Sequence, residues 1–142
     1  MSNILLVSAT KLEHHETELN GIPIHIIGIG KVEAALNTYK LIQKYKPDHV
    51  VNFGSCGNLG NTEIGQVLEI GEVYDDFYGC VVPEHPPIKI SNSVFRLFTT
   101  DSFYDSSAVY SNKYTECINK CDVVDMEGYS IAKVCESENI SL

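Results

Sequence analysis

The chain has 142 residues, with 10 Lys and Arg against 19 Asp and Glu, which gives a formal net charge of −9 at pH 7. A chain this acidic would repel a phosphate backbone and an anionic bilayer, so we expect neither nucleic acid nor a membrane as its partner. Its 44% hydrophobic residues exclude a largely disordered chain, and its length suits a single domain, which we expect to span residues 1–142.

Strand and helix patterns alternate along the first half of the sequence. Apolar runs at residues 4–7, 22–27 and 49–53 predict buried strands. Between the last two runs the apolar residues recur at helical spacing from Val32, and Pro47 predicts the end of that helix. The buried face of the helix is expected to consist of Val32, Ala35, Leu36, Tyr39 and Ile42.

The second half of the sequence is less regular. It is predicted to contain strands at residues 67–74, 94–100 and 123–124, a proline-rich loop between Cys80 and Ile88, a short helix within 104–120, a helix at 126–135 and the start of a strand at 139–142. Gly71 predicts a bulge or bend in the first of these strands. The β–α–β order of the first half predicts parallel strands, so we expect an α/β fold with one mixed, mostly parallel sheet flanked by helices.

Three features follow predicted strands and carry polar chemistry. Glu13 comes after the first strand, a Gly-Ser-Cys-Gly turn at residues 54–57 follows the third, and an Asp-Met-Glu sequence at residues 125–127 lies between a brief strand and a helix. A tight turn, an exposed acid and helix capping are the structural explanations of the three. Their coincidence at the carboxyl edge of one predicted sheet favours a ligand site.

We expect no metal site and no cofactor. The two histidines within residues 13–16 lack HExxH spacing, and the 5 cysteines contain no CxxC pair. Reduced thiols and the lack of a signal-peptide pattern predict a cytoplasmic protein.

The ordered set of segments 28–36, 46–48, 51–57, 100–103 and 124–128 resembles the purine/uridine phosphorylase superfamily, specifically its methylthioadenosine/S-adenosylhomocysteine nucleosidase branch. Residues 82–97 depart from the family's pattern, because this chain is shorter there. The resemblance implies a nucleoside phosphorylase-like fold. It also implies hydrolysis of the N-glycosidic bond of a purine nucleoside, which yields the free base and a ribose derivative.

The resemblance also implies roles for individual residues. Glu13 corresponds to the general base that activates water, and Glu127 to the acid that binds the ribose 2′- and 3′-hydroxyls. Met126 would pack against the sugar and Phe103 would stack on the purine. The remaining residues expected to line the substrate site are Ser55, Cys56, Gly57 and Asp125.

Water is the predicted nucleophile. Family members that use phosphate bind it with arginines, one of which precedes the glycine turn, where this chain has Asn52. The one arginine of the chain, Arg96, lies in a stretch that the family does not use for phosphate. Because a bidentate phosphate clamp requires arginine, we expect a hydrolase, with a nucleoside phosphorylase as an alternative.

The family's acid that protonates the purine would lie after Leu142. Three explanations stay open: a non-catalytic nucleoside-binding or oligomerisation protein, a substitute acid, or an acid from a partner subunit. Asp101 is our candidate for the substitute acid, with Asp125 second. Relatives bury walls of the substrate site between subunits, so we expect a homo-oligomer, a dimer or higher.

Overall fold

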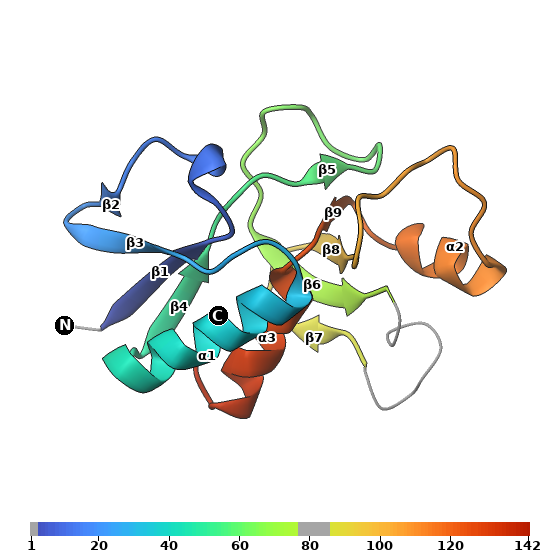
Figure 1. The fold of residues 1–142 in the computed structure, drawn as a ribbon. Helices are drawn as coiled ribbons and strands as arrows, with labels where there is room; N and C mark the ends of the chain where they lie inside the picture. The colour runs from blue at the N-terminus through green and yellow to red at the C-terminus, as the bar shows by residue number, and fades with distance from the viewer. Residues whose placement is uncertain (1–2, 77–85) are drawn as a thin grey trace. The chain divides into compact units, whose positions relative to one another are not determined.

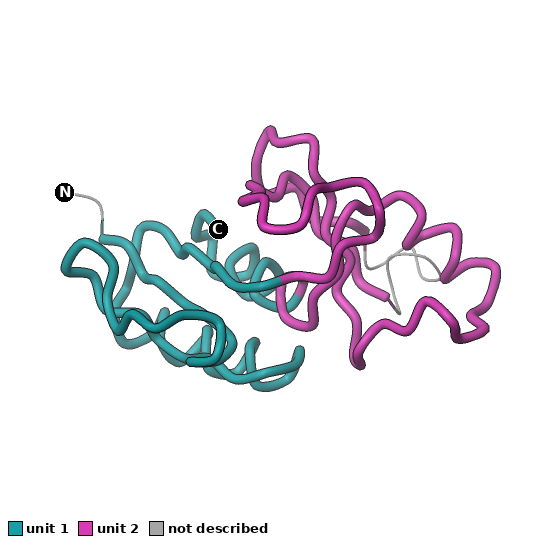
Figure 2. Tube along the Cα trace, turned by 90° about the horizontal axis from the view of Figure 1, so that it is seen from above, with its two compact units in different colours: residues 1–55, 130–142 teal, residues 56–129 magenta. Residues whose placement is uncertain are grey.

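The computed structural model describes residues 3–76 and 86–142, which fold into two compact units, each built on its own sheet (Figures 1 and 2). The first unit comprises residues 1–55 and 130–142, and the second comprises residues 56–129. The α/β class with mostly parallel strands is confirmed, but the strands are divided between two sheets where we expected one. The predicted proline-rich loop lies largely outside the described residues.

The four-stranded sheet of the first unit has the order β2-β3-β1-β4. β1 (Ile4–Ser8) pairs in parallel with β3 (Ile22–Ile26) on one side and with β4 (His49–Asn52) on the other, while β2 (Glu18–Leu19) pairs antiparallel with β3. The apolar run of β1 is buried, as the sequence predicts. The prediction of buried strands is wrong for most residues of β3 and β4, which are partly or fully exposed. The predicted terminal strand is present as a single parallel bridge between Ser141 and His49.

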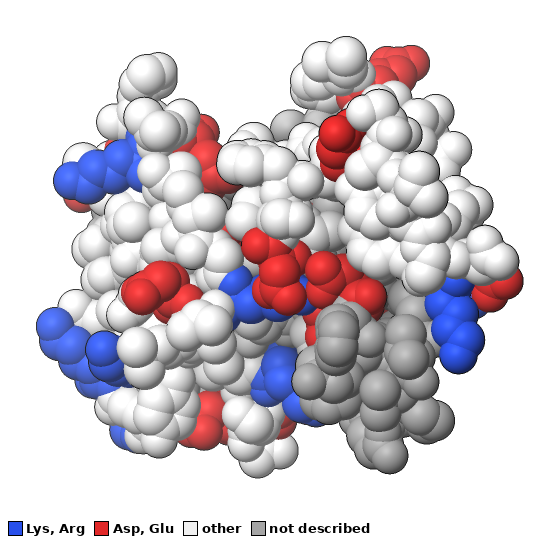
Figure 3. All heavy atoms as spheres, turned by 45° about the vertical axis from the view of Figure 1, so that its right-hand side comes forward, with Lys and Arg blue, Asp and Glu red and all other residues white. Residues whose placement is uncertain are grey.

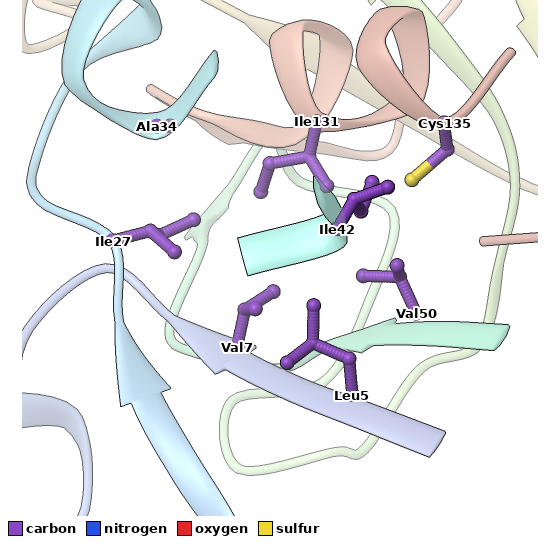
Figure 4. Packing of buried hydrophobic residues seen from close by; sticks show 8 residues of the cluster. All are labelled: Leu5, Val7, Ile27, Ala34, Ile42, Val50, Ile131 and Cys135. Carbon is purple, nitrogen blue, oxygen red and sulfur yellow. The ribbon is translucent and has the colours of Figure 1, made fainter. Parts of the chain in front are cut away.

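Two helical segments cover this sheet and complete one apolar core, which Figure 4 shows from close by. α1 (Lys31–Tyr45) contributes its inner face, and α3 (Gly128–Ser137) contributes the turns after Ser130. The fully enclosed members of the core are Leu5, Val7, Ile27, Ala34, Ile42, Val50, Ile131 and Cys135. Burying each large aliphatic side chain contributes about 1.5–3 kcal/mol, so this core holds the carboxyl ends of β1 and β4 in place.

The buried face of α1 differs from the predicted one. Ala34, Thr38 and Ile42 are buried, whereas Val32 is 78% exposed and Leu36 and Tyr39 are each 46% exposed. The small side chains at 34 and 38 allow the helix to approach the sheet closely, and the larger apolar residues therefore face outward. The helix ends as predicted, with Lys46 in a left-handed conformation before Pro47.

The five-stranded sheet of the second unit has the order β5-β9-β8-β6-β7. Its strands are β5 (Gly57–Asn58), β6 (Ile70–Asp75), β7 (Ile88–Lys89), β8 (Phe95–Thr99) and β9 (Val123–Asp125). β8 pairs in parallel with β6 and β9, and the two edge strands pair antiparallel. The predicted irregularity at Gly71 is confirmed by a register shift between β6 and β8.

The core of the second unit centres on Phe98 of β8, which is fully buried against α2 (Asn112–Ile118). The ring of Tyr114 meets Phe98 edge-on, with 5.2 Å between the ring centroids. The expectation of reduced thiols is wrong for Cys117, which is disulfide-bonded. Free thiols are present at Cys56, Cys121 and Cys135.

Candidate functional site

Glu13 lies just beyond the carboxyl end of β1, in the short 3-10 helix Lys11–Glu13. Thr10 begins this turn, and its hydroxyl accepts a hydrogen bond from the backbone N–H of Leu12 at 3.3 Å. The backbone N–H of Glu13 in turn donates to the carbonyl of Thr10. The turn therefore fixes the backbone from which the Glu13 side chain extends.

Three donors hold the Glu13 carboxylate. The hydroxyl of the fully buried Ser8 donates to Oε2 at 3.0 Å. The backbone N–H and the hydroxyl of Ser55 donate to Oε1 at 3.0 and 2.9 Å. Ser8 ends β1 and Ser55 follows β4, so the pairing of these neighbouring parallel strands brings the donors together. Oε1 accepts two of these donors and Oε2 accepts one, so Oε2 keeps acceptor capacity for a water molecule.

Gly54 permits this arrangement by close approach. A Cβ built on Gly54 would lie 2.7 Å from Glu13 Oε2 and 2.8 Å from Oε1, inside any ordinary contact. A residue with a side chain at position 54 would therefore displace the carboxylate. Position 54 therefore requires glycine, because the Glu13 carboxylate occupies the space that a side chain would fill.

Asp125 ends β9 in the second unit and caps α3. Its carboxylate accepts hydrogen bonds from the hydroxyl of Thr99 and from the backbone N–H of Gly128, both at 2.7 Å. Burial raises the pKa of Asp125 to about 6, and these hydrogen bonds partly oppose that rise. The expectation that Asp125 lines the substrate site stays a prediction, and the structure shows it in a capping role.

Met126 and Glu127 follow directly, between the end of β9 and the start of α3. Glu127 is only 9% exposed, and its negative charge contributes to the raised pKa of Asp125. Met126 is half-buried. An ionised carboxylate only accepts hydrogen bonds, so Glu127 suits a ligand that supplies O–H donors.

The Gly-Ser-Cys-Gly turn reaches the second unit at Cys56 and Gly57. Gly57 pairs with Val124 across β5 and β9, and a Cβ on Gly57 would lie 2.8 Å from the Val124 side chain. Partial burial and the negative charge of Asp125 raise the pKa of the Cys56 thiol. A raised pKa argues against a thiolate nucleophile and suits the backbone role that the resemblance implies.

Asp101 and Phe103 lie in the loop after β8. The backbone N–H of Asp101 donates to the carboxylate of Asp76 at 3.1 Å. Phe103 is 87% exposed, which leaves its ring faces accessible to a planar base. The predicted roles of both residues as acid and stacking platform stay predictions.

The structure thus brings together Glu13 and Ser55 in the first unit, and gathers Cys56, Gly57 and residues 125–127 around β9 in the second. The prediction of one common sheet edge is wrong, because β1 and β4 belong to one sheet and β9 to the other. That Glu13 and Glu127 serve the same nucleoside stays a prediction.

Two residues that donate hydroxyl hydrogen bonds to Glu13 and Asp125 were not predicted from the sequence. Ser8 and Thr99 are both fully buried, and each donates to one of the carboxylates described above. Each is the last residue of an apolar strand, and a small hydroxyl at that position is the signal that could have found it.

Within residues 3–76 and 86–142, no group of three or more His, Cys, Asp or Glu side chains is placed to hold a metal ion. No helix in the same part of the chain is long and apolar enough to span a membrane.

The sequence and the fold are both similar to those of known proteins. The sequence profile of the Phosphorylase superfamily matches residues 10–95, more than half of the chain, so the chain belongs to this superfamily. Two curated relatives, both 5′-methylthioadenosine/S-adenosylhomocysteine nucleosidases, match at 42% identity over 62 residues (Chromohalobacter salexigens) and 38% over 63 residues (Maridesulfovibrio salexigens). The matched segments cover 42% of this chain and span about a quarter of each relative, 26% and 27%.

Solved structures show the same fold over nearly the whole chain. A putative nucleosidase of this kind from Francisella philomiragia superposes with a TM-score of 0.77 at 18% identity, covering 99% of this chain and 82% of that one. The Colwellia psychrerythraea nucleosidase in complex with adenine gives 0.72 at 19% identity, covering 99% and 79%. The futalosine hydrolase of Helicobacter pylori gives 0.75 at 19% identity, covering 99% and 81%.

Proposed function

We propose that the protein is a purine nucleoside N-glycosidase that hydrolyses nucleosides of the methylthioadenosine or S-adenosylhomocysteine type. The observation that carries the proposal is the Glu13 carboxylate, which three donors hold at the carboxyl end of β1. The names of both curated relatives and the adenine bound to a structural neighbour support the choice of substrate.

The proposed chemistry assigns one task to each residue. Cleavage of an N-glycosidic bond passes through an oxocarbenium-like state, in which positive charge develops on the sugar. Glu13 would take a proton from the attacking water, and its three donors fix the direction in which it accepts that proton. Glu127 would accept hydrogen bonds from the ribose hydroxyls, while Met126 packs against the sugar and Phe103 stacks on the base.

Arg96 supports water over phosphate as the nucleophile. Its Nε lies 3.5 Å from the carboxylate of Glu72, and its guanidinium donates to the carbonyl of Lys120 at 3.5 Å. The one arginine of the chain is therefore already engaged within its own unit. A phosphorylase would need that guanidinium, or another of equal geometry, for the phosphate dianion.

The acid that protonates the leaving purine is assigned to Asp101. It follows β8 and lies two residues before Phe103, the proposed stacking residue, in the same loop. Asp101→Asn should lower kcat at least tenfold without changing the affinity for adenine. Unchanged turnover would exclude Asp101 and leave an acid from elsewhere in the assembly.

A homo-oligomer is also proposed, with α1 as its contact. Val32, Leu36 and Tyr39 form an exposed apolar stripe on one face of the helix. Leu36→Glu should convert the oligomer to a monomer in light scattering; a wild-type monomer at micromolar concentration would contradict the proposal.

The kind of ligand and the cellular location are proposals as well. The net charge of −9 and the interspersed acidic and basic side chains on the face in Figure 3 support a small-molecule ligand over nucleic acid. Cytoplasmic location also remains a proposal, although the expectation of reduced thiols behind it is wrong for Cys117; cell fractionation tests it.

The direct test is incubation with a panel of purine nucleosides, with and without phosphate, and identification of the released base. The panel should contain methylthioadenosine, S-adenosylhomocysteine, futalosine and adenosine, because a futalosine hydrolase is among the structural neighbours. Glu13→Gln provides the inactive control. Thermal stabilisation by a nucleoside without any product would favour the non-catalytic binding protein.

A further inference from the structure

The carboxylate of Asp125 is bound by three donors of the protein itself. It accepts from the hydroxyl of Thr99 through Oδ1 and from the backbone N–H of Gly128 through Oδ2, each at 2.7 Å. It also accepts from the backbone N–H of Glu127. Three donors from the protein thus occupy most of the roughly four acceptor positions of this carboxylate.

Thr99 extends this arrangement into the first turn of α3. Its Oγ accepts a hydrogen bond from the backbone N–H of Tyr129 at 2.8 Å while its proton goes to Asp125. The backbone N–H groups at the start of a helix lack intrahelical partners, and here Asp125 and Thr99 satisfy those of Gly128 and Tyr129. β8 and β9 pair in parallel at this point, with Thr99 opposite Asp125.

Met126 and Glu127 are the only residues between Asp125 and Gly128, so this set of hydrogen bonds closes around them. The backbone of Glu127 is bound to Asp125 through its own N–H and restrained again through the next residue. A carboxylate that binds two ribose hydroxyls must be held to within a fraction of an ångström to be effective. The geometry thus ties the backbone from which the Glu127 side chain extends to Asp125.

We propose that Asp125 is a positioning residue for the ribose contact: together with Thr99 it fixes the backbone of Glu127 and does not itself touch the substrate. The inference rests on the proposed function, in which Glu127 binds the 2′- and 3′-hydroxyls. The titratable groups that act on Asp125 or are affected by its charge are the Glu127 carboxylate and the Cys56 thiol.

The test compares methylthioadenosine with its 2′-deoxy analogue. Asp125→Ala should lower kcat/KM for methylthioadenosine by about 10- to 100-fold and should cost the 2′-deoxy analogue much less, because that analogue lacks one of the hydroxyls that Glu127 binds. The affinity for adenine alone should not change. Equal losses for the two nucleosides, or no loss for either, would overturn the positioning role.

Matched variants separate positioning from folding. Thr99→Val removes the hydroxyl and should reproduce the substrate-dependent loss, whereas Thr99→Ser keeps both hydrogen bonds and should retain activity. If Asp125→Ala fails to fold, Asp125→Ser supplies a shorter cap for the same comparison. Asp122→Ala is the control, because Asp122 also binds a backbone N–H, that of Arg96, just before β9 begins. If the wild-type protein releases adenine from neither nucleoside, the proposed function itself fails, and this inference fails with it.

Discussion

Gly54→Ala tests the role of Glu13 with a single added methyl group. No side chain of the wild-type protein is removed, and the backbone of Gly54 is not in the left-handed region, so alanine fits its conformation. The new Cβ would lie 2.7–2.9 Å from three atoms of the Glu13 carboxyl group. To restore a contact of 3.4 Å, the carboxylate must retreat by about 0.7 Å.

That movement has a calculable consequence. The hydrogen bonds of Glu13 to Ser8 and Ser55 are 2.9–3.0 Å long, and a shift of this size stretches or breaks them. A displacement of about 1 Å in a catalytic group can cost about 10²-fold in rate. We therefore expect kcat to fall about 100-fold, with a loss of stability of no more than about 1 kcal/mol, because the end of a flexible side chain can move aside.

The assay is adenine release from methylthioadenosine, with urea unfolding measured in parallel. Gly21→Ala is the matched control, since a Cβ there meets nothing within 4 Å but the backbone φ is +79°. This control should lose about 1 kcal/mol of stability and keep full activity. Wild-type kcat in Gly54→Ala, with the fold intact, would refute the role of Glu13 as the base.

The remaining predictions concern the stacking residue Phe103, the core residue Ile131 and the carboxyl group of Asp125. Phe103→Ala should raise KM for methylthioadenosine about 10- to 100-fold, as loss of one stacking contact implies, and leave the urea midpoint unchanged because the ring is exposed; an unchanged KM would contradict the stacking role. Ile131→Ala should cost about 2–5 kcal/mol in urea unfolding, and a cost below 1 kcal/mol would contradict the packing of α3. The pKa of Asp125 is raised from 3.8 to about 6, so its contribution to stability is full below pH 3.8 and is lost as the pH rises through 6. The free energy of unfolding of the wild type, relative to Asp125→Asn, should therefore fall between pH 4 and pH 7, and parallel pH curves would contradict the raised pKa.

The strands and helices could largely be predicted because their signals are local. The apolar runs that became β1, β3 and β4, and the turn chemistry around Pro47, depend on neighbouring residues only. The prediction of the buried face of α1 was wrong because Leu36 and Tyr39 fit the helical spacing of apolar residues as well as Ala34 and Thr38 do. Ala34 and Thr38 face the sheet because their small side chains allow the helix to approach it closely. The spacing of apolar residues in the sequence carries no information about that approach.

The residues of the candidate site could be predicted from the sequence, but their hydrogen-bond partners and their division between two sheets could not. Glu13 and the glycine turn could be named from motif order, and the parallel pairing of β1 with β4 accounts for their contact. The division of the strands between two sheets follows from long-range pairing, which has no local pattern. The capping role of Asp125 involves Thr99, 26 residues away, and no local pattern pairs the two residues.

The most direct measurement is the rate of adenine release from methylthioadenosine in phosphate-free buffer, for the wild type and for Glu13→Gln. We expect turnover by the wild type that added millimolar phosphate does not accelerate, and a loss of at least 100-fold in the variant. Turnover that requires phosphate and yields a ribose 1-phosphate, or equal rates for the two proteins, would contradict a hydrolysis in which Glu13 activates water.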